Sequence, residues 1–181
     1  LYGLGQRTYK VVEPAEGMAE IDIEVVYDSA REAAAEALEG RGRDVRALSI
    51  ASQGQTFVSL DSKDRPLHRA VMWYDSRGVS IAEELNRKLE EQGDPHRMTG
   101  ISSAVKIVWL RRAFPQKMES AVRYLLLPDY FVYRMTGEPV TDPNTASSTG
   151  LYREGEGYWR PAMEAAGIEK SRLAEVGTPG E

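Results

Sequence analysis

The spacing of apolar residues changes along the chain from short extended runs to helical repeats. Residues 6–12 can form an extended segment, and a helix is predicted from the N-cap Asp22 through Glu39, with Gly40 as its stop. Apolar side chains recur every three to four positions in this stretch, as on a helix with one buried face. The beginning of the chain therefore predicts an extended segment followed by an amphipathic helix.

Three apolar runs between residues 45 and 73 predict neighbouring strands. The run Val45–Ala51 has the composition of a buried central strand. The runs 55–60 and 70–73 are expected to be its partners, and a charged turn at 61–65 joins them. These three runs would form the sheet of the domain.

Beyond residue 78 the pattern becomes mainly helical. The predicted helices cover 79–91, 104–113, a turn from Pro115, 128–135 and 158–166. Asp142, followed by Pro143, has the position of a cap for a Ser/Thr-rich stretch. A strand-rich layer followed by a helical half is typical of one α/β domain with a helical elaboration.

The composition is that of an ordinary globular domain. The chain has 181 residues, of which 41% are hydrophobic and 28% charged, enough to bury a sizeable core. Its formal charge of −5 is spread over interleaved acidic and basic residues, which argues against a nucleic-acid partner. The apolar runs are too short to span a bilayer, so no membrane partner is expected. We expect a cytoplasmic protein, with a homodimer as the assembly to test.

Cysteine is absent and only two histidines are present, which excludes disulfides and thiolate nucleophiles and gives little support to a His-rich metal centre. His68 lies in the link between two predicted strands, and His96 follows Asp94-Pro95 at a predicted helix start. Both are expected to be solvated surface residues. No metal ligand is therefore assigned.

Candidate binding residues gather around the second and third predicted strands. The polar sequence SQGQT at 52–56 interrupts the apolar pattern, and the third strand ends in Trp-Tyr-Asp-Ser-Arg at 73–77. Amides and carboxylates pair with hydroxyl groups, while an indole face covers the C–H side of a sugar. The stretch indicates a pocket for a polyhydroxylated molecule. The alternative is a plain hairpin connection, with Trp73 in the core and Asp75 and Arg77 as a solvated ion pair.

This stretch resembles the amino-terminal domain of the FGGY carbohydrate kinases, in which a strand–(S/N)Q–strand hairpin precedes W-x-D-x-R. The matching residues are Ser52, Gln53, Gln55, Trp73, Asp75 and Arg77. The likeness continues through 99–100, the K-x-x-W-L of 106–110, 127–130, 134–138, 141–142 and 146–150, and so covers nearly the whole chain. It implies the ribonuclease H-like α/β fold of the actin, sugar kinase and Hsp70 group.

The resemblance also implies roles for individual residues. The implied substrate-binding residues are Gln53, Gln55, Trp73 and Asp75, with Asp75 either contacting the sugar or supporting the site. The implied supporting residues are Arg77, Lys106, Asp142 and Asn144. Packing explains Lys106 equally well, because it shares a helical face with Leu110. Asp142 has an equally plain alternative as the cap of a turn.

Two departures from the family bear on the substrate. Glycerol kinases carry an Arg-Glu pair where this chain has Gly54 and Gln55, and pentulose kinases typically carry Met-His. Because Gly54 contributes only space, we expect a substrate bulkier than glycerol and a xylulokinase-like enzyme. The loop between Gly100 and Lys106 is also shorter than in the family.

Phosphoryl transfer from ATP needs a phosphate cradle, Mg²⁺ and a base. The sequence has no P-loop, and Gly3-Leu4-Gly5 lacks the third glycine of a dinucleotide loop. The resemblance implies that the family's phosphate-binding hairpin precedes residue 1 and that the general base and the carboxy-terminal domain follow residue 181. Residues 1–181 would then be most of the first domain of an ATP- and Mg²⁺-dependent kinase, inactive in isolation. The alternative is a non-catalytic sugar sensor or scaffold on the same fold.

Overall fold

A five-stranded sheet of order β1-β2-β4-β3-β5 lies at the centre of the structure, a computed structural model that describes residues 3–178. Its strands are β1 (Val11–Val12), β2 (Glu20–Ile21), β3 (Phe57–Leu60), β4 (Ala70–Val71) and β5 (Arg123–Leu126). All neighbours in this sheet pair antiparallel. Two smaller pairs join β6 (Val140–Thr141) to β9 (Glu175–Val176) and β7 (Tyr152–Arg153) to β8 (Gly157–Tyr158).

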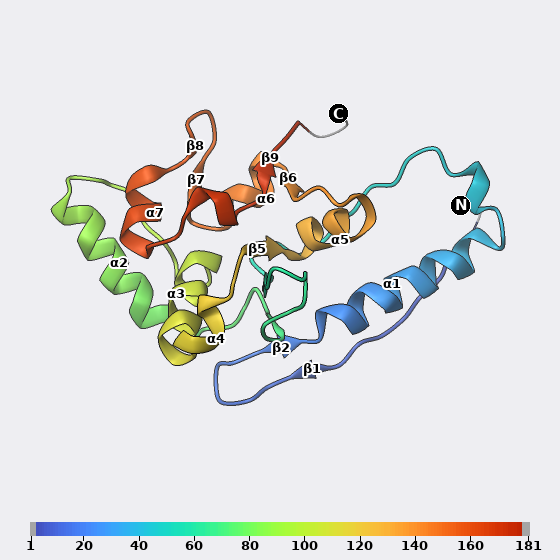
Figure 1. Ribbon diagram of the computed structural model, residues 1–181, viewed down its shortest axis with the longest axis horizontal. Helices are drawn as coiled ribbons and strands as arrows, with labels where there is room; N and C mark the ends of the chain where they lie inside the picture. The colour runs from blue at the N-terminus through green and yellow to red at the C-terminus, as the bar shows by residue number, and fades with distance from the viewer. Residues whose placement is uncertain (1–2, 179–181) are drawn as a thin grey trace.

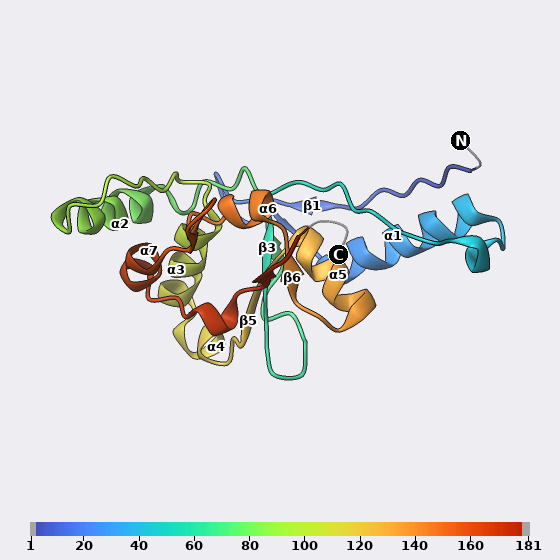
Figure 2. The same cartoon turned by 90° about the horizontal axis from the view of Figure 1, so that it is seen from above.

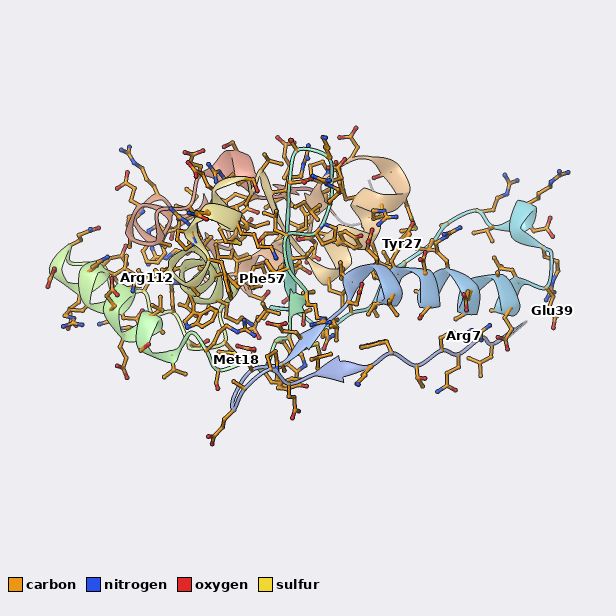
Figure 3. The ribbon with its side chains drawn as sticks, turned by 60° about the horizontal axis from the view of Figure 1, so that its bottom comes forward. Arg7, Met18, Tyr27, Glu39, Phe57 and Arg112 are labelled. Carbon is orange, nitrogen blue, oxygen red and sulfur yellow. The ribbon has the colours of Figure 1, made fainter. Side chains whose placement is uncertain are left out.

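Helices cover the sheet and extend the molecule at both ends. They are α1 (Ile23–Leu38), α2 (Val79–Glu91), α3 (Ser103–Ala113), α4 (Pro115–Glu119), α5 (Leu127–Thr136), α6 (Pro143–Ser147) and α7 (Arg160–Ala166). Helices α2, α3 and α7 pack together at one end, whereas α1 projects from the other (Figures 1 and 2). Figure 3 shows Arg7 beside the projecting part of α1, where it forms ion pairs with Glu32 and Glu36.

The sheet is buried on both faces because helices pack on each of them, and successive side chains of a strand point to the two faces in turn. Phe57 packs in a cluster with residues of α2, α3 and α7, and the next residue, Val58, packs in a second cluster with residues of α1 and α5. Leu126 and Leu125 divide between the same two clusters. Figure 3 shows Phe57 within the densest group of side chains. This double burial explains why β3 and β5 are almost continuously apolar.

Several predicted helices agree closely with the structure because their ends carry clear signals. Helix α2 has the predicted bounds, and α1 begins after Asp22, whose Oδ1 accepts hydrogen bonds from the amides of Glu24 and Val25 at 3.1 and 3.2 Å. The end of α1 differs by one residue, since Glu39 already adopts a left-handed conformation with φ of 48°. Helix α7 starts at Arg160, two residues later than predicted, because Tyr158 belongs to β8.

The central strand predicted at 45–51 is wrong. These residues form no strand, and Val45 and Leu48 are 44% and 62% exposed. A strand needs neighbours for its backbone hydrogen bonds, and β3 pairs with β4 and β5 instead. Leu48 and Ile50 line an open groove of about 530 Å³ together with residues of α5 and β6. The sequence pattern did not predict β5, whose four residues run directly into α5.

Both histidines are half-buried rather than fully solvated. His68 lies against Phe57, with ring centroids 5.7 Å apart, and its Nε2 is 3.0 Å from the Ser59 hydroxyl. Burial lowers the pKa of His68 to about 4. His96 lies edge-on to Trp159, with ring centroids 4.1 Å apart, and burial lowers its pKa. Both rings therefore have structural contacts.

No helix within residues 3–178 has the length and apolar character that crossing a lipid bilayer requires.

Candidate functional site

The polar loop 52–56 is held against the end of β4 by backbone and side-chain hydrogen bonds. The Thr56 amide donates to the Gly54 carbonyl at 2.8 Å, closing a tight turn. The Thr56 hydroxyl is buried and accepts a hydrogen bond from the Trp73 amide at 2.9 Å. Thr56 therefore fixes the loop before β3 next to the residues that follow β4, a role that the sequence did not predict.

Gln55 is held in an unusual backbone conformation. Its φ is 64°, in the left-handed region that favours glycine. Its carbonyl oxygen accepts hydrogen bonds from Lys106 Nζ at 3.1 Å and from the Ser103 hydroxyl at 3.2 Å. Its half-buried side-chain amide makes no hydrogen bond to another of residues 3–178. The backbone is thus fixed, and the amide is available to a ligand.

Trp73 presents an exposed aromatic surface beside this loop. Its side chain is 43% exposed, and its ring meets that of Tyr74 edge-on, with centroids 5.4 Å apart. Gln53, from the loop, has its amide nitrogen 3.9 Å from the sulfur of Met72, the residue before Trp73. Gln53, Gln55 and Trp73 therefore come from two segments that meet at one end of the β3–β4 hairpin.

Asp75 and Arg77 form a buried ion pair. The Asp75 carboxylate is fully buried and accepts the Ala19 amide at 2.6 Å, in addition to the Arg77 backbone amide at 3.0 Å. Arg77 also pairs with Glu20 at 2.9 Å, and its guanidinium carbon lies 5.0 Å from the centre of the Trp109 ring. The interpretation of this pair as solvated is therefore wrong, since both side chains have fixed partners away from water.

Lys106 of α3 lies under the site. Its side chain is fully buried, and its ammonium group donates to the carbonyls of Met72 at 2.9 Å, Gln55 at 3.1 Å and Trp73 at 3.4 Å. Burial lowers the pKa of Lys106 to about 7, although the charge of Asp75 opposes this effect. The structure thus brings Lys106 into contact with two predicted substrate-binding residues.

The predicted supporting residues of α6 are less closely connected. Asp142 caps α6, with Oδ1 accepting the Thr145 amide at 3.0 Å and Oδ2 the Thr145 hydroxyl at 2.5 Å. Asn144 is exposed on the same helix. The end of α6 borders the loop, because a methyl group at Gly54 would lie 3.4 Å from the Ser148 hydroxyl oxygen. Neither Asp142 nor Asn144 is hydrogen-bonded to the glutamines or to Trp73.

Sequence reasoning missed three residues that hold the site together. Thr56 belongs to the polar loop itself, and Ser103 precedes Lys106 by one helical turn, so both had a local signal. Glu20 had none, because it lies 57 residues before Arg77. Within residues 3–178, no group of three or more histidine, aspartate or glutamate side chains is placed to hold a metal ion.

Comparisons with known proteins agree with this architecture. A glycerol kinase from Brucella ovis is 31% identical over 194 residues, covering 96% of this chain and 38% of the relative. The crystal structure of a xylulose kinase from Rhodospirillum rubrum has a TM-score of 0.84 at 23% identity, over 94% of this chain and 37% of that one. A gluconate kinase from Lactobacillus acidophilus has a TM-score of 0.81 at 24% identity, over 97% and 37%.

The structural likeness confirms the predicted ribonuclease H-like fold of the actin, sugar kinase and Hsp70 group. The chain spans 38% of the length of the curated relative named above. A family model described as the FGGY family of carbohydrate kinases, N-terminal domain, matches residues 1–181. The chain therefore belongs to the FGGY family of carbohydrate kinases and corresponds to its amino-terminal domain.

Proposed function

We propose that this chain forms the sugar-binding side of an ATP-dependent kinase that phosphorylates a hydroxyl of a ketose, polyol or sugar acid. The observation that carries the proposal is that Lys106 joins two segments, one with the Gln55 amide, which has no hydrogen-bond partner within residues 3–178, and the other with the exposed Trp73 ring. Lys106 binds the backbone carbonyls of both residues, at 3.1 and 3.4 Å. An amide and an indole on two segments joined in this way would match the polar and the C–H surfaces of a sugar.

The roles of the individual residues follow from their burial. Gln53 and Gln55 would hydrogen-bond substrate hydroxyls, and Trp73 would cover the C–H face. Asp75 accepts hydrogen bonds from Ala19 and Arg77 with both oxygens and is fully buried, which supports a positioning role. Asp142 would act through the cap of α6, because both of its oxygens are used there.

The lack of a side chain at Gly54 supports a substrate larger than glycerol. A methyl group at residue 54 would already be in van der Waals contact with Ser148, 3.4 Å from its hydroxyl oxygen, and glycine leaves this volume free of protein atoms. The substrate would therefore be a pentulose or a sugar of similar size, as in a xylulokinase-like enzyme, and glycerol would be a weak substrate.

ATP with Mg²⁺ would supply the phosphoryl group and the charge that stabilises its transfer. The residues assigned above would act on the sugar. We propose that the phosphate-binding hairpin, the general base and the carboxy-terminal domain belong to other parts of the complete protein. Residues 1–181 alone would then be inactive. A cytoplasmic location and a homodimer stay predictions.

The test is ADP release by the complete protein with ATP and Mg²⁺ over a panel of pentuloses, hexuloses, polyols and aldonic acids. We expect sugar-dependent release with one substrate class, reduced at least about tenfold in kcat/KM by Gln55→Ala. Gln116→Ala, on an exposed glutamine of α4 far from these residues in the fold, is the matched control. Sugar binding without turnover would favour the non-catalytic sensor, and turnover by residues 1–181 alone would contradict the proposal.

A further inference from the structure

Lys106 is a fully buried cation whose hydrogen bonds all go to backbone carbonyls. Its ammonium group donates to Gln55 on one segment and to Met72 and Trp73 on another. A buried lysine is costly unless its three donors are all satisfied. Here the three carbonyls accept hydrogen bonds from all three donors, which offsets the cost of burying the ammonium group.

The two segments joined by Lys106 carry the exposed groups of the site. Gln55 precedes β3, and Trp73 follows β4. Two further contacts link these segments, the hydrogen bond from the Trp73 amide to the Thr56 hydroxyl and the contact between the Gln53 amide and the Met72 sulfur. Lys106 reaches both segments from α3, a third element, and so fixes their separation relative to the helical layer.

Packing alone does not require a charge at this position. The neighbours of Lys106 in α3, including Val105, Ile107 and Leu110, are buried apolar residues. An apolar side chain would fill the same space without the desolvation cost, but it would leave three carbonyls without these donors. The feature that only a donor-rich side chain provides is the fixed spacing of Gln55 and Trp73.

We propose that Lys106 is a positioning residue of the sugar site, whose ammonium group holds the backbones of Gln55 and Trp73 so that amide and indole face the same ligand. This inference rests on the proposed function, because it assigns Gln55 and Trp73 to sugar binding. Lys106 itself does not contact the sugar.

The charged groups that face Lys106 come from the segment after β4. They are Asp75, which favours the protonated amine, and Arg77, which opposes it. Because burial lowers the pKa of Lys106 to about 7, the ammonium group loses its proton at pH values at which enzyme activity can be measured. A neutral amine keeps two donors and loses its charge, so sugar affinity should fall as the pH rises through this range.

The first test measures KM and kcat for the sugar in the complete protein from about pH 6 to about pH 9. We expect Lys106→Met to raise KM at least about tenfold, with a smaller effect on kcat, and to remove the rise of KM with pH. Leu110→Val, one turn along α3 and also buried, is the matched control and should keep the wild-type profile. A wild-type KM and pH profile in Lys106→Met would overturn the inference.

The second test does not depend on the sugar. Amide hydrogen exchange at Trp73 and Thr56 should become faster in Lys106→Met and stay unchanged in Leu110→Val. Unchanged exchange in both variants would show that Lys106 does not hold these segments. If Lys106→Met does not fold, Ser103→Ala is measured instead. It removes the second donor to the Gln55 carbonyl and should raise KM about threefold. An unchanged KM would count against the proposal that the hydrogen bonds to this carbonyl position the sugar site.

The two proposals fail in different ways. If the wild-type protein neither binds nor phosphorylates any sugar of the panel, the proposed function is wrong, and the role of Lys106 in sugar binding is lost with it. The second case is a sugar that the wild-type protein phosphorylates and the Gln55→Ala variant does not. If the Lys106→Met variant phosphorylates that sugar as well as the wild type does, only the inference about Lys106 is wrong.

Discussion

Arg77 holds the Asp75 carboxylate with two parallel hydrogen bonds, from Nε to Oδ1 and from Nη2 to Oδ2, both 2.8 Å long. The side chains are 2% and 0% exposed. Such a two-pronged contact fixes both groups in one geometry. Because Asp75 also accepts the Ala19 amide, the pair ties the segment before β2 to the segment after β4.

Asp75→Ala should destabilise the protein by about 3–5 kcal/mol, because Arg77 would be left buried with Glu20 as its remaining carboxylate partner. Urea unfolding of the complete protein measures this loss. The matched control is Glu164→Gln, which breaks the exposed pair between Arg160 and Glu164 and should leave the unfolding midpoint unchanged. Equal effects of the two substitutions would mean that the buried pair contributes no more than a surface one.

Gln55→Gly should separate stability from function. The left-handed conformation of Gln55, with φ of 64°, costs a non-glycine residue about 1–2 kcal/mol, and glycine relieves this strain at an entropic cost of about 0.5–1 kcal/mol. We expect a gain of about 0.5 kcal/mol in unfolding free energy together with an increase in KM for the sugar.

Gln55→Ala is the control for this prediction, because it removes the amide and keeps the strain. It should raise KM with almost no change in the unfolding midpoint. A Gln55→Gly protein that binds the sugar as tightly as the wild type would show that the amide makes no substrate contact.

The comparison of sequence and structure shows which features local patterns can predict. Helix α2 and the caps at Asp22 and Asp142 depend on residues within a few positions of each other, and the sequence predicted all three. The strand predicted at 45–51 failed because pairing depends on distant segments, and the apolar pattern gives no information about which edge is available.

The candidate site shows the same division. Gln53, Gln55 and Trp73 stood out because polar loops and a terminal tryptophan are local features of the sequence. The contact of Glu20 with Arg77, and the three carbonyls that meet at Lys106, join segments that are 57 and up to 51 residues apart. No spacing rule predicts such contacts, so the burial of the ion pair and of the lysine could come only from the structure.

Trp73→Ala should raise KM for the sugar at least about tenfold, because it removes the aromatic surface that would cover the C–H face. Tyr74→Ala is the matched control, since the Tyr74 side chain is also 43% exposed and lies next to Trp73. We expect less than about a threefold change in KM for Tyr74→Ala. Steady-state kinetics of the complete protein measures both KM values. A larger effect of Tyr74→Ala would show that Tyr74, and not Trp73, covers the C–H face of the sugar.

Asp142→Ala should cost about 1 kcal/mol of stability, the typical effect of losing a helix N-cap. The carboxylate accepts both the amide and the hydroxyl of Thr145, so an alanine leaves the first turn of α6 without its cap. Asp142→Asn keeps an acceptor for the Thr145 amide and should recover most of the stability. If Asp142→Ala lowers kcat with no loss of stability, Asp142 acts on the substrate directly and its assignment as a cap is incomplete.

Asp129 should make stability depend on pH in an unusual direction. Burial raises the pKa of its carboxyl to about 7, with a smaller contribution from the charge of Asp142. Because this value lies above the value of 3.8 for the free side chain, the folded state binds the proton more tightly than the unfolded state between about pH 4 and pH 7. The contribution of Asp129 to stability is therefore fully present below this range and is lost as the pH rises through it.

The difference in unfolding free energy between the wild type and Asp129→Asn isolates this contribution. Asparagine keeps an oxygen that can accept the Leu126 amide, which donates to Asp129 Oδ2 at 3.2 Å in the wild type, but it does not titrate. We expect the wild type to lose stability relative to Asp129→Asn with a slope approaching about 1.4 kcal/mol per pH unit between pH 5 and pH 7. Urea unfolding at several pH values measures the slope. If the difference in unfolding free energy does not change with pH, Asp129 is ionised in the folded protein throughout this range. Its burial would then need a compensating donor beyond the Leu126 amide.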